Sequence, residues 1–461
     1  MTPAQPTAAV RSLVRDDAYE RGIAQLREAL DAEALAVEQA AATPDAQQAV
    51  SAARRLGRAA RRGFLAQHVR PLCSALTDSF REPVLLHELV ELVASLVPGL
   101  VPSAARRTAE EASLPRVQQE GKAVDAGLLA SAVLADELAG RHLQLSHLRP
   151  RAGSLALLDA FVRDGGVDLG PVDVKVTGAR AEVVFTNDYC LNAEDNALVE
   201  AMELAVDLVL LHPGVRVGVL RGGPVTHPKH EGRRIFSAGI NLKHLRSGQI
   251  DFIRFLMGRE LGYVSKLVHG LHGLHGLHGL HGLHGLQGVG HGVGSGGLYG
   301  TVNKPWVAVV EGFAIGGGMQ LVLTCDHVVL VDDAYLSLPA SNEGIVPGAA
   351  ALRLPRLVGE RAARKLILHG DVVRGDDELA LQLVDEVVSA GEVEEALDRA
   401  VATLGDDATA ANKTMLAAGT EDLDQLRRFL AQFAEVQAER LDAPDVLART
   451  GRFAGASRDR A

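Results

Sequence analysis

The sequence predicts an α/β core that is preceded by a helical region and followed by further helices. Apolar residues recur at spacings of three and four up to about residue 160, and again in the last part of the chain, which is the period of amphipathic helices. Between these regions, short valine-rich runs alternate with helical patterns, as in an α/β sheet. We therefore expect a helical N-terminal domain over 1–170, an α/β core over 171–390, and a helical region over 391–461. These last helices are expected to pack against another subunit, although packing within their own chain would give the same pattern.

Bulk properties narrow the class of protein. The chain has 461 residues and a formal net charge of -11, which argues against binding to nucleic acid or to an anionic membrane surface. No apolar run reaches the roughly 18 residues of a membrane span, and no signal peptide is visible at the N-terminus. Cys73, Cys190 and Cys325 fit no disulfide or metal spacing. We expect a cytoplasmic protein with reduced cysteines.

The first elements along the chain are long helices. Helical spacing covers Tyr19–Ala42, Ala46–Val69 and Pro83–Val97, where β-branched alternating runs are rare. The pattern then changes to alternation: Val172–Thr177 and Ala181–Thr186 flank a glycine-containing turn. This arrangement predicts a β-hairpin at the start of the core.

The rest of the core is predicted to alternate strands with helices. A helix is expected over Glu194–His212, and another over Phe252–Val268. Short apolar runs predict four buried strands: Val215–Leu220, Trp306–Val310, His327–Val331 and Leu383–Val388. Amphipathic helices follow over Glu392–Leu404 and Glu421–Leu441.

A low-complexity run interrupts the core. A His-Gly-Leu unit repeats six times over 269–286, and a glycine-rich stretch continues to residue 300. One interpretation is a metal-binding histidine tract. The other is a surface loop, because glycine at every third position costs a helix about 1 kcal/mol each time. We favour the loop over 269–300, and we expect deletion of 269–286 to leave activity intact.

Two glycine-rich turns carry the chemistry. The first is Phe236–Leu242, and the second is Glu311–Gln320, which follows a buried strand and leads into a helix. Glycine lets the backbone approach a ligand closely, and the free N–H groups of a helix N-terminus favour negative charge. A pair of such turns suits a thioester carbonyl that becomes an enolate.

These two motifs resemble the crotonase (enoyl-CoA hydratase/isomerase) superfamily, and the resemblance extends from about 172 to 440. It implies a β/α spiral core, a trimer or a dimer of trimers, and oxyanion-hole donors on the amides of Ile240 and Gly317. The Cys190–Ala193 segment looks like the family's coenzyme A-contacting loop.

The sequence departs from the family's hydratases at both of their catalytic glutamates. Gln320 stands at the first position and Ala340 at the second, and neither side chain can act as a general base. Glu343 is close in sequence but out of register. Simple hydration is therefore disfavoured, and Ala340 and Ile345 are expected to line an apolar pocket for oxygen.

These substitutions and the long helical N-terminal region resemble the metal- and flavin-free dioxygenases of the superfamily. The resemblance implies that 3,5-dihydroxyphenylacetyl-CoA and O2 become 3,5-dihydroxyphenylglyoxylate and coenzyme A, through a thioester enolate and without a cofactor or metal. It also implies a role in antibiotic biosynthesis, in supplying dihydroxyphenylglycine.

Three polar residues are implied to face the aryl end of the substrate: Glu194, Arg259 and Gln320. Each also has a simpler interpretation. Arg259 could form a surface ion pair with Glu260, Glu194 could be an acidic residue in the first turn of a helix, and Gln320 could be an ordinary helix residue.

A basic cluster near the first turn is a candidate site for the phosphates of coenzyme A, although a solvated loop would have the same composition. The candidate substrate- and coenzyme A-binding residues are Asp188, His227, Lys229, His230, Ala238, Gly239, Asn241, Leu242 and Lys243.

Two other functions stay open on the sequence alone. A hydratase, isomerase, decarboxylase or thioester hydrolase on the same fold would need a carboxylate near the thioester, and Glu194 or Glu343 could supply it. A binding protein without activity is the third possibility, although the intact pair of turns argues against it. The ring substitution, the base that removes the α-proton and the oligomer size are not predicted.

Overall fold

The computed structural model describes residues 7–41, 46–105, 122–274, 300–441, 443, 445–446 and 449. The chain forms two compact units, each assembled from segments that are distant in sequence. The first unit comprises 1–146, 252–257 and 427–444, and the second comprises 147–251, 258–426 and 445–461. The three expected domain ranges stay predictions.

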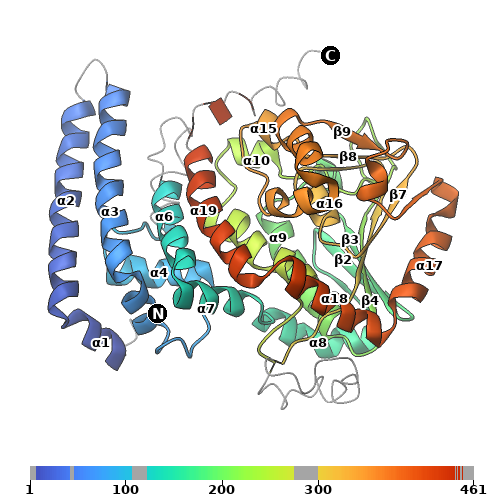
Figure 1. Ribbon diagram of the computed structural model, residues 1–461, viewed down its shortest axis with the longest axis horizontal. Coiled ribbons are helices and arrows are strands. Elements are labelled where there is room, and N and C mark those ends of the chain that lie inside the picture. The colour runs from blue at the N-terminus through green and yellow to red at the C-terminus, as the bar shows by residue number, and fades with distance from the viewer. Residues whose placement is uncertain are drawn as a thin grey trace. The chain divides into compact units, whose positions relative to one another are not determined.

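The first unit is helical. Its helices are α1 (Ala8–Val14), α2 (Asp17–Ala41), α3 (Ala46–Leu76), α4 (Leu86–Leu96), α6 (Lys122–Ala135) and nearly all of α7 (Glu137–His147). The π-helical turn Phe252–Met257 and most of α19 (Leu423–Leu441) complete it. Figure 1 shows α2 and α3 side by side along their length, in blue. The apolar stripes of these helices form the core, which confirms the helical interpretation of this region.

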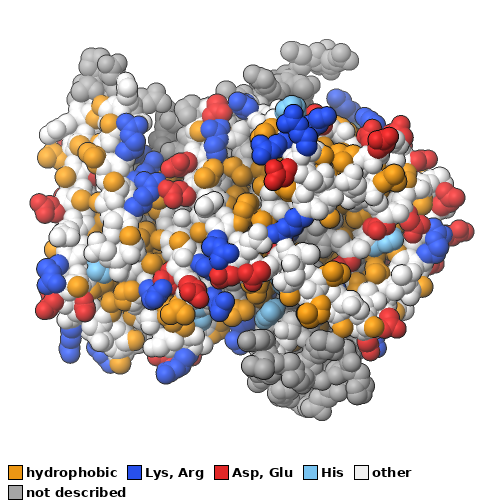
Figure 2. Space-filling model, in the orientation of Figure 1, with side chains coloured by type: hydrophobic (Ala, Val, Ile, Leu, Met, Phe, Trp, Pro, Cys, Tyr) orange, Lys and Arg blue, Asp and Glu red, His pale blue; other side chains and the backbone are white. Residues whose placement is uncertain are grey.

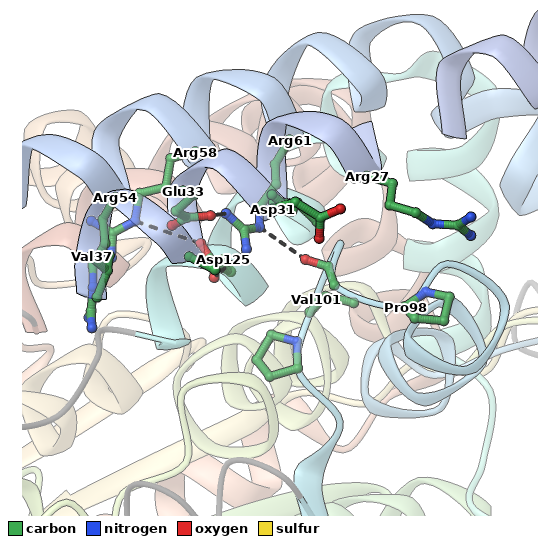
Figure 3. Close-up of a pocket in the computed structure, with 14 residues that line it drawn as sticks. Arg27, Asp31, Glu33, Val37, Arg54, Arg58, Arg61, Pro98, Val101 and Asp125 are labelled. Carbon is green, nitrogen blue, oxygen red and sulfur yellow. Dashed lines mark hydrogen bonds and ion pairs between the residues drawn. The ribbon is translucent and has the colours of Figure 1, made fainter. Parts of the chain in front are cut away.

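A pocket of about 490 Å3 lies within this unit, between α2, α3 and α6 (Figure 3). Arg61 is buried beside it, and its guanidinium donates to Glu33 at 2.8 Å and to the Gly99 carbonyl at 3.2 Å. The same guanidinium lies 3.7 Å from the Asp125 carboxylate. Because Glu33, Arg61 and Asp125 come from three different helices, these ion pairs connect α2, α3 and α6.

The second unit contains a seven-stranded sheet in the order β1-β2-β3-β4-β5-β7-β10. The strands are β1 (Gly166–Asp168), β2 (Val172–Thr177), β3 (Arg180–Phe185), β4 (Val217–Gly222), β5 (Trp306–Val310), β7 (His327–Val331) and β10 (Glu386–Val388). Strands β1 to β3 pair antiparallel, and every pairing from β3 to β10 is parallel. A second sheet consists of β6 (Phe313–Ile315), β8 (Tyr335–Ser337) and β9 (Val372–Arg374).

Helices cover the large sheet. Helix α9 packs on β2 and β3, and α17 packs on β5, β7 and β10 (Figure 1). The α-helices of this unit are α8 (Ala152–Asp164), α9 (Asn196–Leu211), α10 (Leu242–Arg246), α11 (Gly258–Leu261), α12 (Tyr263–His269), α14 (Gly317–Val322), α15 (Ala340–Glu343), α16 (Ala350–Arg364), α17 (Val393–Leu404) and α18 (Asp407–Thr420). Short 3-10 or π segments cover Asp188–Cys190, Lys365–His369, Ala380–Gln382 and Ala390–Glu392.

Most of the predicted strands agree with the structure. Val172–Thr177, Trp306–Val310 and His327–Val331 have the expected bounds, and the hairpin turn is confirmed by the pairing of Thr177 with Arg180. Strands β3 and β4 are shifted by one and two residues, and only the second half of the strand expected over Leu383–Val388 forms β10. The α/β class with helical regions before and after the core is therefore confirmed.

Two expectations need correction. The helix expected over Phe252–Val268 is a π-helical turn followed by α11 and α12, with a break at Gly262. The His-Gly-Leu repeat is not wholly a loop: His269 ends α12, and Leu271 is buried and exchanges two backbone hydrogen bonds with Val302. Residues 275–299, which hold the rest of the repeat, lie outside the described residues.

The surface carries charges of both signs. On the face that Figure 2 shows, basic and acidic side chains are interspersed, with apolar side chains between them. None of the helices in the described ranges combines the length and the apolar character of a bilayer span.

Candidate active site at two glycine turns

The two glycine-rich turns follow neighbouring parallel strands. Strand β4 leads through a loop to the first turn, and β5 leads directly into the second, which contains the short strand β6. Because β4 and β5 are adjacent in the sheet, their carboxyl ends open at the same edge. In open α/β sheets, ligands bind at that edge.

Backbone hydrogen bonds hold the two turns side by side. Ser237 donates its N–H to the Phe313 carbonyl at 3.1 Å, and Ile315 donates to the Ser237 carbonyl at 2.9 Å. On its other side the first turn pairs with Glu194, whose N–H donates to Gly239 at 2.6 Å. Three segments that are distant in sequence thus form one small backbone ladder.

Two glycines are required where the turns meet. Gly239 has φ +79°, and a methyl group there would lie 2.6 Å from the Ile315 carbonyl oxygen and 3.0 Å from the Gly317 nitrogen. Gly316 has φ +54° and ψ -112°, a conformation that side chains rarely adopt. The glycines therefore allow the first turn to approach the N-terminus of α14.

The two amides expected to form the oxyanion hole are available for a ligand. Among the described residues, neither the Ile240 N–H nor the Gly317 N–H has a hydrogen-bond acceptor. Both residues are half-buried. Gly317 is the first residue of α14, where the helix leaves its amides unpaired. The pair is suited to bind a carbonyl oxygen that gains negative charge.

A buried charged cluster lies directly behind the second turn. The Arg259 guanidinium donates through Nε to Glu194 Oε2 at 2.5 Å and through Nη2 to Glu194 Oε1 at 3.1 Å. It also donates to the Gly317 carbonyl at 2.8 Å and to Gln320 Oε1 at 2.7 Å. The structure therefore brings Glu194, Arg259, Gln320 and Gly317 together. The ion pair with Glu260 considered for Arg259 exists, but it is buried and not at the surface, since both side chains are 4% exposed.

The position of the Glu194 side chain explains why residue 317 is a glycine. A methyl group at Gly317 would lie 2.1 Å from Glu194 Oε1 and 3.4 Å from Arg259 Nη2. The second glycine-rich turn and the charged cluster are thus in direct contact.

Two members of the cluster were not predicted as functional residues. The Tyr263 hydroxyl donates to Glu194 Oε2 at 2.8 Å, and Glu260 Oε1 accepts from Arg259 Nη1 at 3.1 Å. The other Glu260 oxygen accepts from the Ala349 amide at 3.2 Å. The spacing of four between Arg259 and Tyr263 was not a reliable signal, because the helix that would place them on one face is broken at Gly262.

Burial and neighbouring charges shift the pKa values of Arg259, Glu260 and Tyr263. Burial raises the pKa of Glu260 and raises that of Tyr263 well above its usual range. Burial by itself would lower the pKa of Arg259, but Glu194, Tyr263 and Glu260 together outweigh it and raise that pKa. The guanidinium is therefore a permanent cation, surrounded by carboxylates that it helps to keep in place.

The remaining residues of the first turn have mixed roles. The Asn241 carboxamide oxygen accepts from the backbone amides of Lys243 and His244. Asn241 therefore serves as the N-cap of α10. Ala238 donates its N–H to the Leu191 carbonyl at 3.0 Å. Leu242 begins α10 and is half-buried, while the Lys243 side chain is exposed.

The loop before the first turn holds the candidate phosphate ligands. The His227 and His230 rings lie 6.1 Å apart, and the His230 ring packs edge-on against Phe313 at 5.6 Å. Lys229, between them, is exposed. Burial, with the nearby His227 and basic side chains adding to it, lowers the pKa of His230. Asp188 is half-buried and begins a 3-10 turn that ends at Cys190, the first residue of the expected coenzyme A loop.

The two residues expected to line the oxygen pocket, Ala340 and Ile345, belong to one compact turn. Ala340 is buried at the start of α15, and its carbonyl accepts from the Ile345 amide at 3.0 Å. Glu343, in the same helix, is 7% exposed, and burial raises its pKa to about 7. The described residues contain no group of three or more His, Cys, Asp or Glu side chains arranged to hold a metal ion.

Comparison with known sequences identifies related proteins. Residues 298–444 match the sequence model of the enoyl-CoA hydratase/isomerase family. A relative from Amycolatopsis orientalis, a (3,5-dihydroxyphenyl)acetyl-CoA 1,2-dioxygenase, is 42% identical over 418 residues, covering 91% of this chain and 92% of its own. A crotonyl-CoA hydratase from Syntrophomonas wolfei is 38% identical over 97 residues, which are 21% of this chain and 37% of that protein.

The solved structures that resemble this chain have lower sequence identity to it than the Amycolatopsis orientalis relative does. A crystal structure of an enoyl-CoA hydratase from Mycobacterium avium subsp. paratuberculosis aligns with 62% of this chain and 99% of its own, with a TM-score of 0.47 and 22% sequence identity.

Proposed function

The chain belongs to the enoyl-CoA hydratase/isomerase family, and from this premise we propose that it is a dioxygenase acting on an arylacetyl-CoA. The proposed reaction converts 3,5-dihydroxyphenylacetyl-CoA and O2 to 3,5-dihydroxyphenylglyoxylate and coenzyme A. Its main support is a relative with that substrate in its name, 42% identical over most of both chains. The family resemblance inferred from the two glycine turns is confirmed.

The reaction begins with the thioester enolate. We propose that the thioester oxygen binds the free amides of Ile240 and Gly317, which stabilise the negative charge as the α-proton leaves. One donor of such a hole contributes roughly 10²–10³ in rate. Gln320 and Ala340 replace the two catalytic glutamates of the hydratases, and neither side chain can act as the general acid or base that hydration needs.

The later steps balance without an external oxidant other than O2. The enolate gives one electron to O2, and the two radicals combine to form a C–O bond at the α-carbon. The resulting peroxide attacks the thioester carbonyl and expels the coenzyme A thiolate. The O–O bond then breaks as the remaining α-hydrogen leaves as a proton, and the product is the α-keto acid. An electron-rich aryl group makes the enolate a sufficient reductant, so we infer that the reaction needs no metal or flavin.

We assign the polar cluster to the aryl end of the substrate. Glu194, Arg259 and Gln320 form one hydrogen-bonded group in contact with Gly317, so they are suited to fix the phenolic ring relative to the enolate. We propose that Ala340 and Ile345 border the space for O2. The exposed Lys229 and Lys243, with His227 and His230, are the proposed contacts of the coenzyme A phosphates.

The wider setting follows from the same proposal. We infer a cytoplasmic homo-oligomer, a trimer or a hexamer, whose α-keto acid product supplies dihydroxyphenylglycine for antibiotic biosynthesis.

An oxygen-electrode experiment tests this function. The purified protein should consume one O2 per thioester cleaved, and treatment with a chelator should not change the rate. Release of coenzyme A at the full rate under anaerobic conditions would contradict the proposal and would favour a thioester hydrolase.

A further inference from the structure

The helical segment that carries Arg259 is interrupted three residues later. Helix α11 ends at Leu261, Gly262 has non-helical φ and ψ of -91° and -118°, and α12 begins at Tyr263. Both Arg259 and Tyr263 donate to Glu194. The break therefore lies between two side chains that must keep a fixed relation to each other.

Side chains satisfy two of the backbone groups that the break releases. In a continuous helix the Tyr263 N–H would donate to the carbonyl four residues earlier; instead it donates to a carboxylate oxygen of Glu203. The Glu260 carbonyl accepts from the Ser265 hydroxyl at 2.6 Å. Since buried backbone groups need partners, these contacts stabilise the break as part of the fold.

Glu203 is held in the break from the other side. Its second oxygen accepts from Lys266 Nζ at 2.9 Å and from Arg151 Nε at 3.1 Å, and its side chain is 9% exposed. Burial opposes its ionisation, but Lys266 and Arg151 together lower its pKa. A methyl group at Gly262 would lie 1.6 Å from the first oxygen, so the carboxylate occupies the space that a side chain would need.

One helix supplies both anchor points. Helix α9 starts immediately after Glu194, with Asp195 as its N-cap, and carries Glu203 in its middle. The acid that binds Arg259 and the acid that holds the break are thus rigidly connected through a helix whose residues on the inner face are buried.

We propose that Glu203 is a positioning residue for the reaction proposed above: by capping α12 at Gly262, it holds Arg259 and Tyr263 in place on Glu194. The inference rests on the proposed function only in that it assigns the Glu194 cluster to catalysis.

Two conservative substitutions separate positioning from charge. In Glu203→Gln an amide oxygen can still accept from the Tyr263 N–H, but the negative charge is lost. In Glu203→Asp the charge remains, but the side chain is about 1.5 Å shorter and cannot reach that N–H while it binds Lys266. We expect kcat to fall about tenfold or more in Glu203→Asp and no more than about threefold in Glu203→Gln, with KM for the thioester nearly unchanged in both.

Asp207→Asn is the matched control. Asp207 is also buried and accepts from the same Lys266 Nζ at 2.6 Å, but it makes no contact with the break in the described structure. This variant should lower the melting temperature as much as Glu203→Gln does and keep kcat. A Glu203→Asp enzyme with wild-type kcat, a larger loss in Glu203→Gln than in Glu203→Asp, or an equal kcat loss in the control would overturn the proposal.

The readout distinguishes this proposal from the proposed function. Each variant is measured both by O2 uptake and by anaerobic exchange of the α-hydrogens of 3,5-dihydroxyphenylacetyl-CoA with heavy water. If the wild type exchanges these hydrogens but consumes no O2, the dioxygenase function fails while the order of the Glu203 variants in exchange still tests positioning.

Discussion

Replacing Arg259 with lysine keeps the positive charge, but it should still lower both stability and activity. The Arg259 guanidinium makes five hydrogen bonds inside the cluster, two to Glu194 and one each to Gly317, Gln320 and Glu260. An ammonium group has three donors on one atom and no fork geometry. At least two of the five bonds must therefore be lost.

The magnitude follows from the nature of these bonds. Hydrogen bonds to charged groups contribute about 1.5–3 kcal/mol each, so losing two costs roughly 3–6 kcal/mol before the cluster relaxes. Since breaking a buried ion pair costs a similar 3–5 kcal/mol, we expect Arg259→Lys to lower the unfolding free energy by about 3 kcal/mol. We expect kcat to fall about 100-fold, because the contact with the Gly317 carbonyl also positions the oxyanion turn.

The assay combines thermal unfolding with O2 uptake at saturating and limiting thioester. Arg61→Lys is the matched control, since Arg61 is a buried arginine with two carboxylate partners in the other unit (Figure 3). It should lose stability and keep the kcat of the folded enzyme. Wild-type kcat, KM and melting temperature in Arg259→Lys would refute the reasoning, and so would an equal fall in kcat in the control.

Three further outcomes are expected. Gln320→Glu adds a third carboxylate to one guanidinium and should slow O2 uptake roughly tenfold (about 1.4 kcal/mol); an unchanged rate would make Gln320 a bystander. Burial raises the pKa of Glu343 from 4.5 to about 7, so its contribution to stability is full below pH 4.5 and is lost as the pH rises through 7. Glu343→Gln should therefore flatten the denaturant-measured stability between these values and gain up to roughly 3 kcal/mol over wild type at pH 8, whereas parallel pH curves would exclude this. Deleting 275–286 should leave O2 uptake unchanged. Deleting 269–286, which the sequence alone predicted to be harmless, should instead lower the melting temperature, because it removes His269, which lies 3.4 Å from Glu421, and the Leu271 pairing with Val302; a wild-type melting temperature in the longer deletion would contradict this.

Local patterns predicted much of the fold. Strand β5, all of whose residues are buried, has the expected bounds, because a short valine-rich run with a preceding proline and a following glycine has one stable conformation in a sheet. The small sheet β6-β8-β9 was not predicted, because its strands have three residues each and no legible period. The break at Gly262 was not predicted either, because its cause is Glu203, nearly sixty residues away in sequence.

The candidate site was predictable where backbone geometry determines it. The glycine turns placed Ile240 and Gly317 side by side through the pairing of β4 with β5, which the motifs specify. The partners of Arg259 were only partly predictable: its burial and its contact with Tyr263 depend on how α9 packs, and sequence spacing does not encode that packing.

Isotope labelling tests the central claim most directly. The wild-type protein is incubated with 3,5-dihydroxyphenylacetyl-CoA under heavy-isotope oxygen gas in ordinary water, and the organic acid product is analysed by mass spectrometry. We expect 3,5-dihydroxyphenylglyoxylate that carries both atoms of one O2 molecule. An unlabelled 3,5-dihydroxyphenylacetate, with its new oxygen taken from water, would contradict it.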